Sequence, residues 1–520
     1  MKIKMKKTYY LMGVVVSALM FGSCDSYLDE TPDNRTEVDS KDKISKLLVT
    51  AYPKNNFQMI AEFASDNIDD NGSKYSPYTR FLSDAWEWKD TKEEDNDSEQ
   101  NLWDACYSAI AAANLALESI DKLGNPEDLN PQRGEALICR AYSHFVLSYI
   151  FCNTWTEAGK DKELGIPYMK ATEKTVSPTY ERGTLGSVYE NIAEDIEAGL
   201  PLISDDAYSV PKYHFNRSAA YAFATRFFLY YGKYDRAIEC ANQVLGSNPT
   251  SVLRDWQSYG KLDRNKMIQP NAYFDADDKA NLLIYDTYST WGRYCYPASI
   301  NEKYTHNETI AKTETCQSTG VWGSSSVLYH QAANYSDIPK CIMRKVGQYF
   351  EYTDVAAGVG YVHTLVNAFN TDGVLLDRAE AYALKGDFAK SIADMQVFEN
   401  NYTKSKVVLS EDVINNFYDN IEYYTAEKPT IKKELNPTFA LPKGSDNLIQ
   451  FILYARRILT LDEGLRWGDI KRYGIEVRHR IVENNTVLVV DSLMKDDPRR
   501  AIQIPYNVMT AGLKANPRNK

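Results

Sequence analysis

The sequence predicts a mainly α-helical protein, in which helix pairs form a scaffold and a loop-rich, partly β region is attached to them. Three observations lead to this fold class. Apolar residues recur every three or four positions over long stretches, and alanine-rich helix pairs turn at glycines. Other stretches are rich in Gly, Pro, Asn, Asp and aromatic residues without such a period, which is typical of loops.

The first two long helices are expected between residues 102 and 151. In the first, one apolar stripe keeps spacings of three and four, and it consists of Leu102, Cys106, Ala109, Ile110, Ala113, Leu117 and Ile120. Gly124 and Pro126 end this helix. Pro131 opens the next helix, which is apolar nearly all round as far as Phe151, so we expect it to be buried on several sides.

Two later stretches resemble each other and the helix pair of tetratricopeptide repeats. Residues 216–246 and 373–398 each contain an alanine-rich helix, a glycine turn at Gly232 or Gly386, and a second helix. Glycine permits the left-handed backbone of such a turn. Because only two clear copies occur, far apart, we expect a tetratricopeptide-like helix-pair scaffold and not a regular superhelix.

We expect a single domain over residues 43–520. The helical scaffold should cover about 99–250 and 373–474, and the loop-rich region about 54–98 and 251–345. Short strand-like pieces at 281–286 and 486–490 indicate small sheet elements.

The N-terminus has the layout of a secretory signal. Four lysines within the first seven residues precede an uncharged, largely apolar run at 9–21, and Gly22-Ser23-Cys24 follows. This run is shorter than the ~20 residues that span a bilayer as a helix. A cysteine after two small residues resembles the lipobox of bacterial lipoproteins. We therefore expect a signal peptide at 1–23, lipidation of Cys24 and a tether at 24–42; a plain secretory signal with an accidental cysteine is the alternative.

No other apolar run approaches spanning length, so we expect a protein that is anchored to a membrane by lipid and not threaded through it. Removing the four leader lysines takes the net charge from −12 to −16. Nucleic acid and anionic headgroups call for a basic face, so this charge argues against both as partners. The 38 tyrosines and 8 tryptophans suit solvent-facing binding surfaces, although most of them are expected in the core.

Seven cysteines remain besides Cys24, and no CxxC motif is present, so neither a zinc ribbon nor a thioredoxin-like site is indicated. Cys106, Cys139 and Cys240 lie in alanine-rich helical patterns, where a free cysteine acts as a small core residue. Cys295 and Cys316 could form a loop disulfide.

The C-terminal fifth carries a family resemblance. Residues 448–474 form an amphipathic helix followed by Glu463, Arg466 and Asp469, and the chain closes with AIQIPYNVMTAGLKANPRN. These segments resemble the SusD/RagB family of outer-membrane lipoproteins of Bacteroidota. The leading lipobox, the RAEAYALKGD stretch, and a set of first-helix residues resemble the same family; the set is Trp103, Tyr107, Ile110 and Asn114.

One departure from the family pattern concerns the arginine pair of the amphipathic helix. The family usually carries Glu just before the arginine pair and again shortly after it, where this chain has Ala455 and apolar residues around Leu459. Glu463, Arg466 and Asp469 are spaced by three residues, so we expect an ion-pair network along one helical face.

The resemblance implies a non-catalytic receptor on the extracellular face of the outer membrane, above a SusC-like, TonB-dependent transporter. Such a receptor captures a glycan or, in the RagB-like branch, a peptide, and delivers it to the transporter. The helical scaffold would contact the transporter, and a loop-rich face would carry the ligand site. No cofactor is implied.

Enzyme signatures are missing from the sequence: it contains no GxSxG, HExxH or P-loop motif, and its six histidines lack metal-ligand spacing. A glycoside hydrolase stays open as an alternative because 71 acidic residues could include a catalytic pair. A purely structural helical-repeat lipoprotein is a further alternative, although it would leave the aromatic loops without a purpose.

Residues 66–72 compare with a calcium loop, but Tyr78 stands where an EF-hand needs Glu, so an EF-hand is not expected. A polar turn is the simpler interpretation and a looser calcium site is the alternative; no metal site is predicted. The acidic run at 92–99 is interpreted as a solvated helix start.

We predict that 54–98 and 291–329 converge on one exposed face and form an aromatic platform for the ligand. The chosen rings are Trp322 and Tyr296, then Trp86 and Tyr75, with Asn67 and Asp69 as acceptors for ligand hydroxyls. The alternative for each ring is that it fills the gap between loop and scaffold.

Overall fold

The computed structural model describes residues 38–175, 179–264, 267–296, 302–335, 338–483 and 486–518. From Lys41 onward the chain forms one compact unit. The expected signal peptide and Cys24 lie outside the described residues. No helix in the described ranges is both long and apolar enough to cross a membrane.

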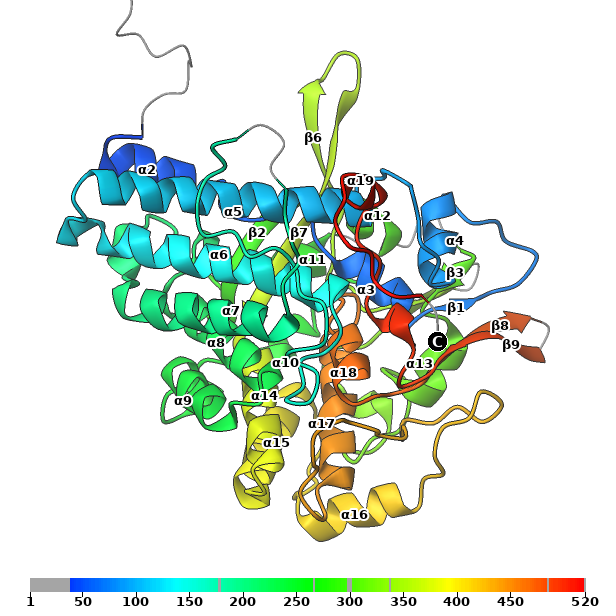
Figure 1. Cartoon of the computed structure of the whole chain (residues 1–520). Helices are drawn as coiled ribbons and strands as arrows, with labels where there is room; N and C mark the ends of the chain where they lie inside the picture. The colour runs from blue at the N-terminus through cyan, green and yellow to red at the C-terminus, as the bar shows by residue number, and fades with distance from the viewer. Residues whose placement is uncertain are drawn as a thin grey trace, which may run out of the picture. The chain divides into compact units, whose positions relative to one another are not determined.

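The unit is mainly α-helical, as the sequence predicts, and the long helices of the scaffold lie side by side (Figure 1). They are α5 (Glu99–Lys122), α6 (Asn130–Phe151), α7 (Leu185–Gly199), α8 (Arg217–Tyr230), α9 (Tyr234–Leu245), α14 (Thr371–Leu384), α15 (Phe388–Tyr402) and α17 (Asp446–Leu459). Shorter helices connect them: α2 (Lys41–Leu48), α3 (Gln58–Ala64), α4 (Arg80–Trp86), α10 (Trp256–Tyr259), α11 (Ile268–Tyr273), α12 (Trp291–Tyr294), α13 (Glu308–Glu314), α16 (Glu411–Asp419), α18 (Arg466–Arg472) and α19 (Tyr506–Thr510).

Local signals account for the helix boundaries. The Ser98 side chain accepts the backbone N–H of Asn101 at the start of α5, and Pro131 stands in the first turn of α6. Gly232 and Gly386 have φ of 73° and 80°, so they form the left-handed turns that the two helix pairs require. Helix α6 is buried along almost its whole length, as its all-round apolar sequence predicts.

The described residues of this unit also form three small sheets. Their strands, in spatial order, are β3 (Tyr304–Thr305), β1 (Asp69–Asp70), β8 (Val477–Glu483) and β9 (Thr486–Leu493) in the first; β2 (Asn281–Tyr288), β7 (Val359–Asn370) and β6 (Tyr349–Asp354) in the second; β4 (Ala333–Tyr335) and β5 (Ile338–Ile342) in the third. Both expected strand pieces lie within β2 and β9. In the first sheet Asp69 pairs with Thr305 and Asp70 with Ile481, so three distant segments of the chain meet there.

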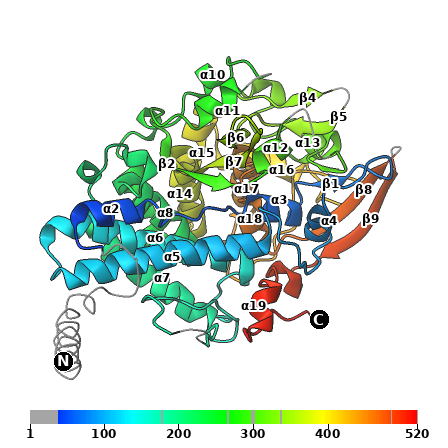
Figure 2. The ribbon, with the colours of Figure 1, turned by 90° about the horizontal axis from the view of Figure 1, so that it is seen from above.

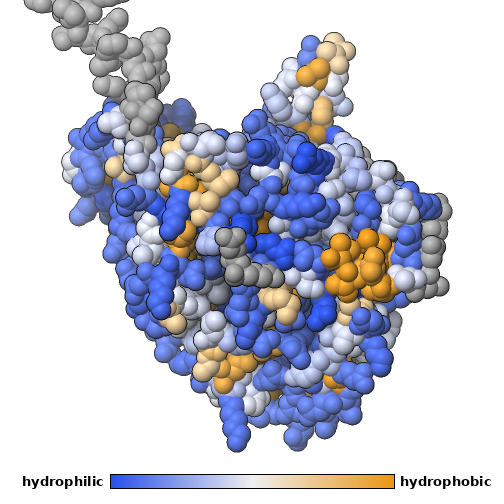
Figure 3. All heavy atoms as spheres, turned by 45° about the vertical axis from the view of Figure 1, so that its right-hand side comes forward, coloured by the Kyte–Doolittle hydropathy of each residue, from blue (hydrophilic) through white to orange (hydrophobic). Residues whose placement is uncertain are grey.

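Figures 1 and 2 show the scaffold helices α5 to α9 on one side of the unit, and α4, β1, β8 and β9 on the other. Outside the scaffold, two of the strand pairs expose apolar side chains. The β6–β7 hairpin projects from the surface with Tyr352 and Val355 57% and 80% exposed, and β9 exposes Leu488 and Val490 in an apolar patch (Figure 3).

A buried network of ion pairs joins the loop after α3 to α13, α17, α18 and β8. At one end, Glu314 contacts Lys433 at 2.6 Å and Arg480 at 2.9 Å. Burial alone would raise the pKa of Glu314, but the charges of Lys433, Arg480 and Arg457 lower it to about 2. Burial lowers the pKa of Lys433 to about 8, which still leaves this lysine protonated at pH 7. The pairs are therefore ionic at neutral pH.

At the other end of the network, Asp66 accepts two hydrogen bonds from Arg466, at 2.8 and 2.9 Å. The expected ion-pair network among Glu463, Arg466 and Asp469 is wrong. Helix α18 begins only at Arg466, so Glu463 precedes the helix and contacts Lys345, while Asp469 pairs with Arg456 of α17.

The structure does not form the Cys295–Cys316 disulfide that the sequence left possible. The Cys316 sulfur lies beside Cys341 instead, because the segment after α13 packs against β5 and not against the end of α12.

Replacing Glu314 by glutamine should destabilise the fold strongly at neutral pH, because buried Lys433, Arg457 and Arg480 lose a shared counter-charge. We expect a loss of ~3–5 kcal/mol in the free energy of unfolding, measured by urea denaturation at pH 7. The pKa of Glu314 is depressed in the folded state, from 4.5 to about 2. Its stabilisation is therefore present above pH 4.5 and is lost as the pH falls toward 2, so variant and wild type should converge in acid.

The matched control is Glu194→Gln, because the carboxylate of Glu194 pairs with Lys170 at 2.8 Å while 67% exposed. That variant should stay within ~1 kcal/mol of wild type. Equal stability of wild type and Glu314→Gln at pH 7 would contradict the role given to the network.

Candidate functional site

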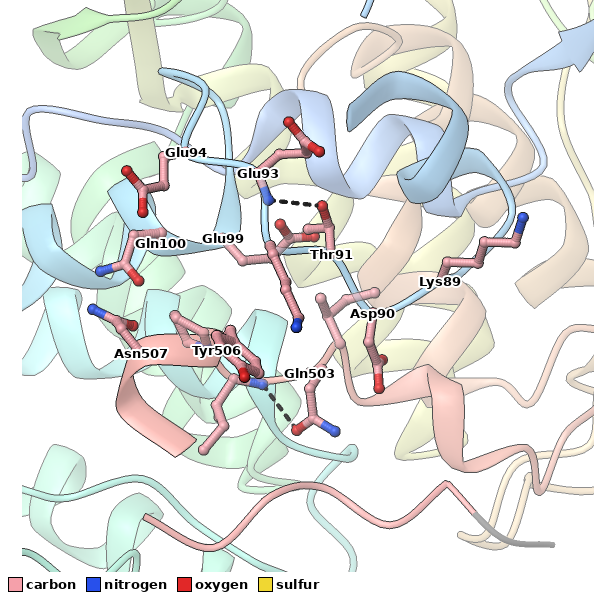
Figure 4. Close-up of a pocket in the computed structure, with 14 residues that line it drawn as sticks. Lys89, Asp90, Thr91, Glu93, Glu94, Glu99, Gln100, Gln503, Tyr506 and Asn507 are labelled. Carbon is pink, nitrogen blue, oxygen red and sulfur yellow. Dashed lines mark hydrogen bonds between the residues drawn. The ribbon is translucent and has the colours of Figure 1, made fainter. Parts of the chain in front are cut away.

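A solvent-open pocket lies where the loop before α5 meets the C-terminal segment around α19 (Figure 4). The space between its walls is about 490 Å³ when the open solvent at its mouth is included. Residues 89–94, the first residues of α5 (Glu99 and Gln100) and residues 502–507 line it. The pocket therefore joins two segments that are some four hundred residues apart in the sequence.

The loop wall of the pocket is held by hydrogen bonds at both of its ends. Within the loop, Thr91 Oγ1 accepts the N–H of Glu93 at 3.1 Å. The Asn101 side chain donates to the carbonyl oxygen of Glu94 at 3.0 Å, which fastens the loop to α5. Buried Asp97 accepts the backbone N–H of Thr290 at 2.9 Å, which ties the same loop to the end of β2.

The opposite wall is the C-terminal segment, and one glutamine fixes its course. The side-chain oxygen of Gln503 accepts the N–H of Ile504 at 3.1 Å and that of Asn516 at 2.8 Å. Pro505 then precedes α19, so that Tyr506 stands at the first position of the helix. Tyr506 is 45% exposed, and Lys92 Nζ lies 3.9 Å from the centre of its ring.

Glu99 gives the pocket its most unusual group. Its side chain is buried, yet Oε2 has no hydrogen-bond partner in the part of the chain that the structure describes. Burial raises the pKa of Glu99 from 4.5 to about 7. Near neutral pH this carboxyl can therefore donate a hydrogen bond as an acid or accept one as a carboxylate.

The chemistry of the pocket suits a polar ligand with an apolar face. A tyrosine ring can pack on the apolar face of a sugar, and the side chains of Gln100, Gln503 and Asn507 can exchange hydrogen bonds with hydroxyls. Lys92 and Glu93 provide charges of opposite sign, which could also receive the termini or side chains of a peptide.

The two tryptophans predicted for an exposed platform are in the core, so that part of the prediction is wrong. Trp322 is 2% exposed and stacks on Tyr454 of α17, with ring centres 5.2 Å apart. Trp86 is also 2% exposed, donates to the carbonyl oxygen of Ile68 at 3.1 Å, and stacks on His479. Each ring fills space between a loop and the helix or strand behind it.

Asn67 and Asp69 are likewise buried, at 0% and 2% exposed, so they cannot serve a ligand on the surface. Arg457 donates to the Asn67 side-chain oxygen at 2.8 Å, and Arg480 donates to both carboxylate oxygens of Asp69, at 3.0 and 2.8 Å. The polar turn at 66–72 thus pairs with the interior. Among the described residues, no cluster of three or more His, Cys, Asp or Glu side chains could hold a metal ion.

Tyr75 and Tyr296 remain predictions. Both are half-buried and lie outside the pocket of Figure 4; the rings face Lys74 and Arg344, at 5.2 and 5.0 Å. Of the two regions expected to converge, 54–98 supplies the loop wall, whereas 291–329 does not line the pocket.

The sequence interpretation missed Glu99 and Tyr506. The run at 92–99 has the composition of a solvated helix start, but its last three residues, Asp97 to Glu99, are buried. The signal for Tyr506 was present in the closing segment, where an aromatic follows a proline, but nothing local connects that segment to residue 92.

Comparisons with known proteins agree with this fold. A family model for SusD-like proteins, described as starch-binding and associating with the outer membrane, matches residues 26–229. A SusD-like protein of Formosa agariphila is 23% identical over 499 residues, covering 88% of this chain and 90% of the relative.

Solved structures show the same architecture over nearly the whole chain. A putative sugar binding protein of Bacteroides vulgatus has a TM-score of 0.65 at 18% identity, covering 93% of this chain and 99% of its own. A SusD superfamily protein of Bacteroides thetaiotaomicron has a TM-score of 0.61 at 17% identity, covering 91% and 98%.

The fold is thus that of the SusD superfamily: mainly α, with helix pairs and small sheets. The chain is thus similar to SusD-like proteins: a family model matches residues 26–229, one relative aligns over 499 residues, and the solved structures share the fold, in keeping with the SusD/RagB resemblance of the sequence.

Replacing Glu99 by glutamine should stabilise the protein at alkaline pH. The pKa of Glu99 is raised in the folded state, from 4.5 to about 7, so the carboxyl increasingly opposes folding as the pH rises through this range. Glutamine cannot ionise, so the variant should gain up to ~3 kcal/mol in the free energy of unfolding at pH 8 and little at pH 4.

Glu93→Gln is the control, because Glu93 lines the same pocket with a carboxylate that is 37% exposed. Its stability should follow wild type at both pH values in parallel urea titrations. A Glu99→Gln variant that is less stable than wild type at pH 8 would show that the carboxylate has a partner after all.

Proposed function

We propose that this protein is a cell-surface glycan-binding lipoprotein that captures nutrient ligands and delivers them to a SusC-like, TonB-dependent transporter of the outer membrane. The observation that carries the proposal is the SusD-type fold over nearly the full chain, together with the family description as starch-binding and associating with the outer membrane. The lipobox-like Gly22-Ser23-Cys24 supplies the anchor, through lipidation of Cys24.

The pocket between residues 89–100 and 502–507 is our candidate for the ligand site, in place of the buried tryptophans. One exposed tyrosine ring with amides around it matches the alternation of apolar faces and hydroxyls on a sugar. Tyr75 and Tyr296 would extend the contact surface for a longer oligosaccharide.

Particular residues in this pocket favour two other functions as alternatives. Charges of both signs, on Lys92 and Glu93, also suit a peptide, which favours a RagB-type receptor as the second candidate. Glu99 has the raised pKa of a general acid and lines the pocket beside Glu93, which is the feature that a glycoside hydrolase would share.

The test of glycan capture is calorimetry on the mature protein with a panel of oligosaccharides and peptides. Tyr506→Ala should weaken oligosaccharide binding by about tenfold or more, because a stacking surface is lost, while the melting temperature stays near that of wild type. Tyr352→Ala removes a ring that is 57% exposed on the β6–β7 hairpin and should bind normally.

Mass spectrometry of the same mixtures separates the three functions. Intact oligosaccharide is expected at the end of the incubation. Multiple-turnover cleavage would establish the hydrolase, binding of peptides alone would establish the RagB-type receptor, and unchanged affinity of Tyr506→Ala would remove the pocket as the site.

Cys24→Ala should release the protein from membrane fractions, because the acyl chains on this cysteine are the expected anchor and each buried methylene adds ~0.8 kcal/mol to membrane binding. Ser26→Ala, in the expected tether, is the control and should remain in the membrane pellet. Surface proteolysis of intact cells should digest the wild type. A Cys24→Ala protein that stays in washed membranes would show that another element provides the anchor.

A further inference from the structure

Two cysteines that are distant in sequence meet inside the loop-rich region. Cys316 follows α13 and Cys341 lies in β5, and their sulfur atoms are 3.7 Å apart. Both side chains are buried, at 2% and 3% exposed. Neither residue was expected to pair with the other from the sequence.

The backbone on each side of this contact is fixed by hydrogen bonds. The N–H of Cys341 donates to the carbonyl oxygen of His306 at 2.8 Å. Beyond Cys316, the N–H of Gln317 donates to Ala311 at 2.8 Å and that of Ser318 to Thr315 at 3.0 Å. The two sulfurs are therefore held next to each other by the fold and do not meet through a loose chain end.

We propose that Cys316 and Cys341 are joined by a disulfide bond in the exported protein. An S–S bond is about 2.05 Å long, so the sulfurs must approach by roughly 1.7 Å, which small side-chain rotations can supply. Disulfides form and persist in exported proteins, so this proposal rests on the export that the proposed function requires.

The bond forms by thiol–disulfide exchange with a disulfide-bearing oxidant, either an oxidised dithiol protein or glutathione disulfide. The Cys341 thiolate attacks the oxidant while the chain is still open, forming a mixed disulfide and releasing one oxidant thiolate, which takes up a proton. The Cys316 thiolate then attacks the Cys341 sulfur and expels the second oxidant thiolate. Two cysteine thiols have lost two protons and two electrons, and the oxidant disulfide has become two thiols.

The surroundings of Cys316 favour the second step. A hydrogen bond from Cys341 and the neighbouring His306 hold the pKa of Cys316 well below its usual range, although burial opposes this. The thiolate is the nucleophile in disulfide exchange. The finished bond would fasten the segment after α13 to β5. It would thereby hold Glu314, two residues before Cys316, in the buried ion-pair network.

The test traps thiols in cells with N-ethylmaleimide, isolates the protein under denaturing conditions without reductant, and maps its peptides by mass spectrometry. We expect the peptides of Cys316 and Cys341 to be linked, about 2 Da lighter than their sum. The remaining described cysteines should carry the label: Cys106, Cys139, Cys152, Cys240 and Cys295. Cys316→Ser should leave Cys341 labelled, whereas Cys240→Ser should leave the link intact. The denaturing readout does not require either variant to fold.

A second arm is independent of export: the purified mature chain is reduced, unfolded and refolded in a glutathione redox buffer. The same link should form there. Labelled Cys316 and Cys341 in the refolded protein, or a link from either one to Cys295, would overturn the proposal. If the protein in the cells of the first arm does not reach the membrane, while the Cys316–Cys341 link forms in the second arm, the result counts against the proposed function alone.

Discussion

The structure depends on one constraint: charges buried in the interior must meet opposite charges, wherever in the sequence these are. Asp66 and Glu314 are both nearly inaccessible and both lie against Arg457 and Lys433. An unpaired buried charge costs several kcal/mol, so none of these segments can move away alone. The loop after α3, helix α13 and the segment at 433 are thereby fixed in one arrangement, and loops of low regularity acquire a defined position.

Helix α17 connects this network with a second one. Arg457 contacts Asp66 and Glu314 on the loop-rich side, while its neighbour Arg456 contacts Glu380 of α14 and Asp469 of α18. Adjacent residues on a helix point about 100° apart, so two consecutive arginines reach two separate clusters. The absence of glutamate at Ala455 does not leave the arginines unpaired, because their partners come from other elements. Replacing buried pairs by apolar residues is often neutral for stability, so we interpret these networks as fixing how the scaffold and the loops join.

The scaffold could be predicted because its signals are local. The stripe of α5, the proline of α6 and the glycines at 232 and 386 each act within a few residues, and the strand pieces lie inside β2 and β9. The site could not be predicted in the same way. Whether an aromatic loop residue faces solvent depends on which residues pack against it. Trp322 stacks on Tyr454, which lies 132 positions further along the chain. Asn67 meets Arg457 at a separation of 390 residues. Composition indicated that aromatic residues are available for a binding surface but could not determine which of them face solvent.

Glu99 and Glu314 show how the same side chain acquires opposite properties in this fold. Both are buried, yet burial raises the pKa of Glu99 to about 7, whereas three cations bring that of Glu314 to about 2. Glu99 has no cationic partner among the described residues and lines a pocket that is open to solvent. Glu314 has three cationic neighbours and is enclosed. The fold supplies cations to some of its interior carboxylates, whereas Glu99 keeps an oxygen without a hydrogen-bond partner among the described residues and lines the pocket. A ligand hydroxyl there would meet a carboxyl oxygen that no described protein group already satisfies, which makes the unpaired carboxyl a better marker of the site than the abundance of aromatic residues.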